Sequence, residues 1–176
     1  MKMERTIDII KADSEKCKVK KMRNDLFLPH VCELVAQGHK VSIRPKGVSM
    51  RPFLESDRDV AFLAKPYGVK VGDVVLAELS SGTYVLHRIV KIEGEKVVMR
   101  GDGNIRGSEA CLLNDVRAVA VGFERKGRYW SVDTSFWKIY SYVWPRLFPI
   151  RRLLLALYRI FFLGEWSLVW KKISGK

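Results

Sequence analysis

A serine, a histidine and an aspartate lie in three glycine- or proline-punctuated segments, and together they can carry out nucleophilic acyl chemistry. Ser49 lies in Gly-Val-Ser-Met-Arg-Pro (47–52), His87 in Leu-His-Arg-Ile (86–89) and Asp102 in Gly-Asp-Gly-Asn (101–104). A serine hydroxyl becomes a good nucleophile when a base takes its proton, and a carboxylate can hold that base in the useful tautomer. The sequence therefore predicts Ser49 as nucleophile, His87 as base and Asp102 as the orienting carboxylate.

The turn around Ser49 favours this chemistry. Gly47 permits close backbone approach, and Pro52 stiffens the turn. Such a turn presents a hydroxyl beside free backbone N–H groups, so Gly47 and Ser49 are the predicted oxyanion-hole residues. Each residue also has an ordinary explanation: a turn serine, a hydrogen-bonded strand histidine, and an aspartate that caps an Asp-Gly turn. Their ordered combination favours the catalytic interpretation.

This order of motifs, with Gly-Asp-Val-Val (72–75) between the serine and the histidine, resembles the S24/S26 serine peptidases. That group contains type I signal peptidases and self-cleaving SOS-type repressors, and the resemblance covers about residues 40–122. It implies that Ser49 is the nucleophile, that His87 replaces the lysine base of the bacterial signal peptidases, and that Asp102 matches the Asp of a Gly-Asp-x-Asn motif. The implied activity is endopeptidase cleavage of a peptide or protein, as in signal-peptide processing, with no metal and no cofactor.

The chain departs from that pattern in its acidic residues. Members of this group that use a histidine as the base usually carry a further acidic pair five or six residues after the Asp of that motif. This chain has Gly107 and Ser108 at those positions. Glu109 follows one residue later, so the orienting carboxylate stays open between Asp102, Glu109 and Asp115. The sequence shows neither the N-terminal membrane anchor of signal peptidases nor the helix-turn-helix domain of the repressors, and it looks most similar to compact bacterial S24/S26-like peptidases.

The segments that must position these residues have the pattern of β-strands. Runs rich in β-branched residues, separated by Gly, Asp and Ser, occupy 41–44, 59–63, 74–79, 84–92, 96–100 and 116–121. Residues 80–83 and 93–95 are typical of hairpin turns, which predicts antiparallel pairing. Upstream we expect a short edge strand at 6–10, a mobile stretch at 13–23, and a helix at 25–37 that ends at Gly38 and tolerates Pro29 only in its first turn.

These patterns predict a mainly β fold, an antiparallel S24/S26 peptidase-like domain with one N-terminal helix and a helical C-terminal tail. Residues 1–23 are a polar, mobile segment, 24–124 the peptidase domain and 125–176 a basic, aromatic-rich tail. Of the net charge of +13, the tail carries +9, from 11 Lys/Arg against 2 Asp/Glu. Helices are expected at 136–148, 150–163 and 165–172.

The tail has the composition of a membrane-surface element. Thirteen of the nineteen aromatic residues lie between Tyr129 and Trp170, and basic residues mixed with aromatics and leucines suit anionic lipid better than nucleic acid. The apolar stretch 153–163 is too short to span a bilayer, which takes about 18 residues. We therefore expect peripheral membrane binding by 136–172. The alternatives are packing on the β domain, a dimer contact, or a spanning anchor at 153–170.

The remaining features suggest a location and rival functions. Cys17, Cys32 and Cys111 share no motif spacing, which indicates unpaired thiols in a reducing compartment and no zinc site, with Cys32 in the core. The first 25 residues lack the apolar region of a secretory signal, so we expect a cytoplasmic protein with peripheral membrane association. The main rival to the peptidase is a non-catalytic module of the same fold that binds a peptide or partner at a membrane. A nucleic-acid binder is suggested only by the charge.

Overall fold

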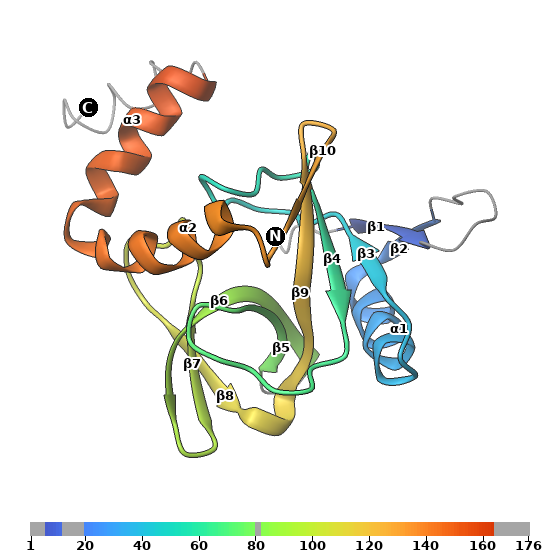
Figure 1. Cartoon of the computed structure of the whole chain (residues 1–176). Helices are drawn as coiled ribbons and strands as arrows, with labels where there is room; N and C mark the ends of the chain where they lie inside the picture. The colour runs from blue at the N-terminus through green and yellow to red at the C-terminus, as the bar shows by residue number, and fades with distance from the viewer. Residues whose placement is uncertain (1–5, 12–19, 80–81, 164–176) are drawn as a thin grey trace.

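The computed structural model describes residues 6–11, 20–79 and 82–163, and in this part the chain is mainly β, as predicted. Figure 1 shows an antiparallel sheet that curls on itself, with helices at its two sides. The elements, in chain order, are β1 (Thr6–Lys11), β2 (Lys20–Arg23), α1 (Asn24–Ala36), β3 (Val41–Ile43), β4 (Val60–Ala64), β5 (Val74–Leu79), β6 (Thr83–Glu93), β7 (Lys96–Arg100), β8 (Glu109–Leu112), the 3₁₀ turn Leu113–Asp115, β9 (Val116–Arg125), β10 (Arg128–Ser131), α2 (Ser135–Arg146), the 3₁₀ turn Phe148–Ile150 and α3 (Arg151–Leu163).

The strands follow the order β2-β1-β3-β4-β9-β5-β6-β7-β8, and β10 pairs with β9. The pairings between the described strands are antiparallel, which confirms the hairpin prediction. β6 pairs with β5 over Thr83–Arg88, but with β7 only over Arg88–Glu93. Within the described chain, the first half of β6 therefore has no strand partner on its β7 side.

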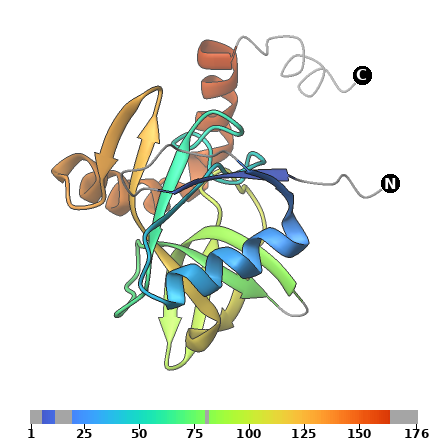
Figure 2. The same ribbon diagram turned by 90° about the vertical axis from the view of Figure 1, so that its right-hand side faces the viewer.

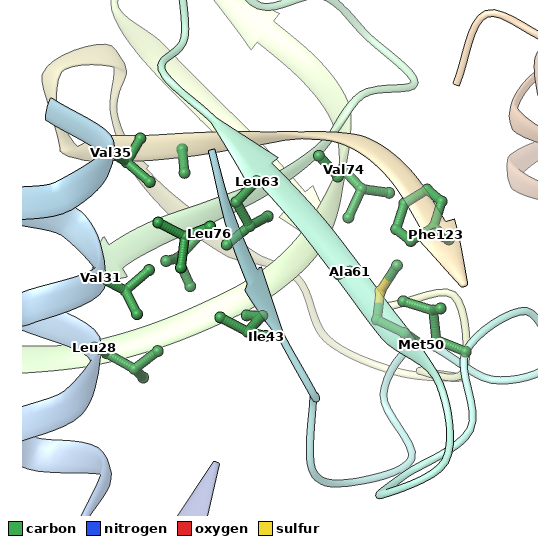
Figure 3. Packing of buried hydrophobic residues seen from close by; sticks show 14 of the residues in the cluster. Leu28, Val31, Val35, Ile43, Met50, Ala61, Leu63, Val74, Leu76 and Phe123 are labelled. Atoms are coloured by element: carbon green, nitrogen blue, oxygen red, sulfur yellow. The ribbon is translucent and has the colours of Figure 1, made fainter. Parts of the chain in front are cut away.

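One face of α1 packs against the sheet and closes the main core. Leu28, Val31 and Val35 recur at the spacing that places side chains on one side of a helix. Figure 3 shows them directed at buried side chains of the strands, including Leu63 and Leu76. Burying an aliphatic side chain of this size stabilises a protein by roughly 1.5–3 kcal/mol, so this contact holds the helix on the sheet.

Pro29 lies at the sixth residue of α1, one turn later than the sequence prediction allows. Proline removes one backbone hydrogen bond at that point of a helix, which weakens it locally. Phe27 and Val31, on either side of Pro29, are completely buried. Tertiary packing therefore maintains the helix despite the missing bond.

Three short strands, β2, β8 and β10, were not predicted from the sequence. β2 forms within the stretch 13–23 that was expected to be mobile, and it pairs with β1. Since β3 covers the other side of β1, the strand predicted at 6–10 is present but is not at the sheet edge. β8 was not predicted, and β10 extends the sheet past residue 124 into the segment assigned to the tail.

The helices predicted at 136–148 and 150–163 are present as α2 and α3, at Ser135–Arg146 and Arg151–Leu163. The helix expected at 165–172 lies outside the described residues. Trp137 and Trp144, on one side of α2, are buried. The centroid of the Trp137 ring lies 4.6 Å from the Phe53 ring centroid and 4.5 Å from the Phe123 ring centroid. α2 therefore packs on the β domain. Figures 1 and 2 show α2 and α3 on a different side of the sheet from α1, with α3 directed away from the strands. No described helix is both long and apolar enough to cross a bilayer.

Candidate active site

Ser49 lies in the loop between β3 and β4, residues 44–59, which we call the serine loop. Gly47 has a φ of +107°, a conformation that a side chain would strain, so the glycine of the motif is required there. Three buried side chains, Met50, Phe53 and Leu54, hold the loop on the core. The predicted turn is therefore present, and it is fixed from below by apolar packing.

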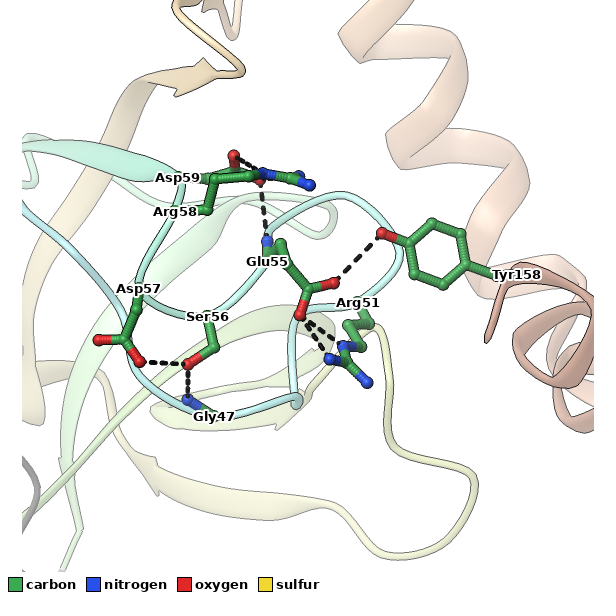
Figure 4. A network of polar contacts seen from close by, with 8 residues as sticks. All are labelled: Gly47, Arg51, Glu55, Ser56, Asp57, Arg58, Asp59 and Tyr158. Atoms are coloured by element: carbon green, nitrogen blue, oxygen red, sulfur yellow. Dashed lines mark hydrogen bonds and ion pairs between the residues drawn. The ribbon is translucent and has the colours of Figure 1, made fainter. Parts of the chain in front are cut away.

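Polar contacts complete the serine loop, and Figure 4 shows them. The Gly47 N–H donates to Ser56 Oγ at 3.0 Å. Arg51 Nε donates to Glu55 Oε1 at 2.9 Å, and the Glu55 N–H donates to Asp59 Oδ2 at 2.9 Å. These contacts join residues within the loop, so they stabilise its conformation in addition to the buried apolar side chains.

His87 makes its polar contact with Glu109. Its Nδ1 lies 3.0 Å from Glu109 Oε2, while the histidine is 5% exposed and the Glu109 side chain 32% exposed. An Nδ1–H donated to a carboxylate leaves the lone pair on Nε2, the tautomer that a general base requires. Of the three carboxylates considered from the sequence, Glu109 is the one that the structure places on His87.

Strand register brings Glu109 to this place. Met99 on β7 is paired with Ile89 on β6 and with Glu109 on β8. Glu109 therefore lies in register with Ile89, two strands away across the sheet. Ile89 is two residues after His87 on β6. Because β8 is a short strand without an apolar pattern, the sequence did not reveal this pairing.

Asp102 does not contact His87, contrary to the expectation from the Gly-Asp-x-Asn motif. Both of its carboxylate oxygens accept from Arg88, from Nε at 2.8 Å and from Nη2 at 2.7 Å. Tyr140 Oη donates to the same carboxylate at 3.0 Å. Successive strand residues point to opposite faces of a sheet, so Arg88 and His87 lie on opposite faces. Asp102 pairs with Arg88 and is therefore on the face opposite His87.

The Arg88–Asp102 pair lies in the protein interior, where each side chain is 1% exposed. Burial opposes the charge on Arg88, but the charge and hydrogen bonds of Asp102 outweigh it and raise the arginine pKa. Burial, together with the Asp102 charge, raises the pKa of Tyr140 well above its usual value. Tyr140 therefore remains a hydrogen-bond donor, and the cluster has a structural role beside the site.

Asp115 also lies away from the histidine. Its Oδ2 accepts the Leu112 N–H at 3.2 Å in the turn that follows β8. Arg117 lies 4.0 Å from its other oxygen. Asp115 thus caps a surface turn.

The backbone of residues 101–104, the motif that contains Asp102, nevertheless contacts the backbone of Ser49. The Gly103 N–H donates to Ser49 O at 2.7 Å. A Cβ added to Gly101 would collide with Ser49 O, and one added to Gly103 would collide with Val48 O. Both glycines are needed because residues 101–104 lie directly against the serine loop.

Ser49, His87 and Glu109 line one pocket of about 330 Å³. Its other lining residues include Pro45, Lys46 and Gly47 from the serine loop and Tyr84, Val85 and Leu86 from the part of β6 that has no partner on its β7 side. Leu28, Ile43, Met50, Leu54 and Leu76 provide an apolar base. The pocket therefore joins the candidate catalytic side chains to an open strand edge and an apolar surface.

The predicted oxyanion-hole residues differ in their availability. The N–H of Gly47 is engaged by Ser56. The N–H of Ser49 makes no hydrogen bond within the described residues. Ser49 N–H is consequently the better candidate donor to a developing oxyanion.

Asp102→Asn should destabilise the protein by about 3–5 kcal/mol, the usual cost of breaking a buried ion pair by removing one partner. The reason is that Arg88 would keep its buried charge and lose the charged partner that offsets its desolvation. Urea unfolding followed by circular dichroism measures the change. Asp57→Asn, at an exposed surface pair, is the matched control, and equal stability of the two variants would contradict this assignment.

Cys32 and Cys111 are free thiols, as predicted, and Cys17 lies outside the described residues. Burial is the main cause that raises the pKa of Cys32 to about 11. Burial also raises the pKa of Cys111, with a contribution from Asp115. The environment of a nucleophilic cysteine lowers the pKa of its thiol, so neither Cys32 nor Cys111 has such an environment.

Comparison of the chain with models of known protein families and with curated proteins gave no match.

Proposed function

We propose that this chain is a serine endopeptidase of the S24/S26-like type, with Ser49 as nucleophile, His87 as general base and Glu109 as the orienting carboxylate. The observation that carries the proposal is the shared pocket of these three side chains together with the 3.0 Å contact between His87 Nδ1 and Glu109 Oε2. This replaces Asp102 as the orienting residue by the carboxylate that touches the histidine.

In the proposed mechanism, Nε2 of His87 takes the proton of Ser49 Oγ as the oxygen attacks the peptide carbonyl carbon. Glu109 holds Nδ1–H and stabilises the imidazolium that forms. The N–H of Ser49 donates to the carbonyl oxygen as its negative charge develops. His87 then protonates the leaving amine, and a water molecule that His87 activates hydrolyses the acyl-enzyme ester. Each step uses groups of this chain, so the proposal includes no metal or organic cofactor.

The substrate proposed for this pocket is an extended peptide that adds itself as a strand to the free edge of β6. Residues Tyr84–Leu86, which pair with β5 but not with β7, line the pocket beside His87. Main-chain hydrogen bonds to such an edge give affinity, and pockets below alternate residues give specificity. The apolar base under Ser49 favours small apolar side chains next to the cleaved bond.

Cleavage of a mixed peptide library tests this function. Purified protein should generate new N-termini, detected by mass spectrometry, with small apolar residues enriched before the cleaved bond. The His87→Ala variant removes the base and should lose these products, whereas His39→Ala, at an exposed histidine, should keep them. A library left intact by the folded wild type would favour the rival function, a binding module of the same fold.

A further inference from the structure

The outward sides of α2 and α3 expose apolar side chains that the β domain does not cover. Ile139 and Val143 are 63% and 40% exposed on α2, and Leu153, Leu157 and Phe161 are 61%, 40% and 72% exposed on α3. Spacings of four residues place each set along one side of its helix. Each helix therefore carries an apolar stripe on its surface, and we call the two stripes together the outer face.

The other side of each helix is packed on the β domain, so the outer face cannot rotate toward the domain without breaking that packing. Trp137 and Trp144 of α2 are buried against the domain, and Arg151 at the start of α3 is 2% exposed. Trp144 also donates from Nε1 to the backbone oxygen of Asp102 at 3.0 Å. The opposite sides of these helices are thus fixed, and their apolar stripes remain in solvent.

Charge around the outer face is positive. α2 and α3 contain no Asp or Glu, and Lys138, Arg146 and Arg152 are exposed on them. Arg146 Cζ lies 3.4 Å from the centroid of the exposed Tyr142 ring, within the surface of α2. A surface that joins exposed leucine and phenylalanine to arginine without acidic residues matches an anionic lipid interface.

We propose that the outer face of α2 and α3 binds the surface of an anionic membrane, with the apolar side chains inserted among the acyl chains and the basic residues at the headgroups. This proposal does not depend on the peptidase activity. It commits to a peripheral interaction.

Vesicle co-sedimentation tests the membrane proposal. The full chain should bind phosphatidylcholine vesicles that contain phosphatidylglycerol, bind pure phosphatidylcholine vesicles far more weakly, and be released by high salt. Leu157→Ser together with Phe161→Ser should weaken partitioning at least tenfold, because the variant loses two apolar side chains that the bilayer would bury. Arg146→Gln should weaken it about fivefold, from about 1 kcal/mol per basic residue.

Tyr67→Ser is the matched control, since Tyr67 is 91% exposed on a loop outside the C-terminal helices, and it should bind like the wild type. Lack of binding to anionic vesicles would overturn the proposal. Binding that ignores lipid charge and survives high salt and carbonate would also overturn it, in favour of a spanning anchor. Concentration-dependent dimers that disappear in the Leu157/Phe161 variant, without vesicle binding, would identify a second copy as the partner instead.

A separate observation concerns the inner side of these helices, which holds residues 101–104 against the serine loop. Trp144 binds the Asp102 carbonyl oxygen, and Arg151 Nη1 donates to Asn104 O at 3.3 Å. Between these contacts, Gly103 donates to Ser49 O, and Asn104 lines the pocket. Contacts from the helices therefore reach the backbone of the proposed nucleophile through a single intervening loop.

α3 also contacts the serine loop directly. Tyr158 Oη donates to Glu55 Oε2 at 3.3 Å, and Glu55 holds Arg51, two residues after Ser49 (Figure 4). Neither Trp144 nor Tyr158 lines the pocket. Their contacts act on the loops that carry the site.

We infer that α2 and α3 set the position of Ser49 through residues 101–104, with Trp144 and Tyr140 as positioning residues. This second inference rests on the proposed peptidase function. A displacement of about 1 Å at a reacting atom can cost about a hundredfold in rate. The helices would thus be needed for turnover although they contribute no side chain to the pocket.

Acylation by a fluorophosphonate probe tests this inference. Trp144→Phe keeps an aromatic ring and loses the Nε1–H bond, and Tyr140→Phe removes only the hydroxyl that binds Asp102. We expect each to lower kcat and the acylation rate about tenfold or more at a temperature where it is folded, with KM unchanged. Trp130→Phe, on β10, makes the same chemical change elsewhere and should react at the wild-type rate.

The possible failures are distinguishable. If wild-type protein is not acylated, the proposed function fails. If wild type is acylated and both variants react at its rate, the positioning inference fails while the peptidase remains. A lower melting temperature with an unchanged acylation rate would likewise show a purely structural role.

Discussion

Ser49→Ala should abolish peptide cleavage, with a loss of roughly 10⁶-fold in kcat, as expected when the nucleophile of a serine peptidase is removed. The hydroxyl is the only group in the proposed mechanism that bonds to the substrate carbonyl carbon, and neither His87 nor Glu109 can replace it in the same geometry. Stability should change by no more than about 0.5 kcal/mol, because the side chain is only partly buried and the serine loop is held by Met50 and Phe53.

Steady-state cleavage of a fluorogenic peptide, together with thermal unfolding, measures both effects. Ser135→Ala, at the exposed start of α2, is the matched control and should leave kcat unchanged. Normal cleavage by Ser49→Ala would remove Ser49 from the mechanism.

The second large effect is expected at Glu109. Glu109→Gln should lower kcat by about 10⁴-fold, the loss seen when a triad carboxylate becomes an amide. The amide cannot stabilise the imidazolium, and its oxygen and nitrogen do not select the Nδ1–H tautomer as a carboxylate does. The side chain is 32% exposed, so the free energy of unfolding should change little.

Glu95→Gln, in the exposed β6–β7 hairpin, provides the matched control for this variant. Asp102→Asn supplies a contrasting result, since it should lower stability strongly through Arg88. A decrease of less than tenfold for Glu109→Gln would reduce the site to a Ser49–His87 dyad or assign the orienting role elsewhere.

The contrast between Glu109 and Asp102 shows where sequence reasoning reaches its limit. Local patterns were sufficient to predict β5 and β7 at their observed bounds, since both are β-branched runs closed by turn residues. Which carboxylate meets His87 depends on the pairing of β7 with β8, a contact between strands whose register no local pattern specifies. The loop of the Gly-Asp-x-Asn motif lies against the serine loop, but its aspartate pairs with Arg88 and not with His87.

Arg88 itself carried a signal that the sequence interpretation did not use. It follows His87 in a strand, so the alternation of side chains directs it to the opposite face. An arginine buried there needs a carboxylate, and Asp102 is the acidic residue of the next motif along the chain. This reasoning would have left Glu109 and Asp115 as the candidates for His87.

The tail illustrates a different limit. Its composition correctly indicated helices, but α2 buries Trp137 and Trp144 on the β domain while Ile139 and Val143 stay exposed. Amphipathic periodicity alone cannot tell which apolar side of such a helix packs on its own domain and which is left for a partner. Tertiary contacts with Phe53, Phe123 and Asp102 decide that question.

The most direct test of the central claim is to trap the nucleophile with a serine-reactive fluorophosphonate and map the adduct by mass spectrometry. The proposed mechanism predicts one adduct per chain, located on Ser49, formed slowly in His87→Ala and Glu109→Gln and absent in Ser49→Ala. Folded wild-type protein that forms no adduct, or an adduct on another residue that persists in Ser49→Ala, would contradict it.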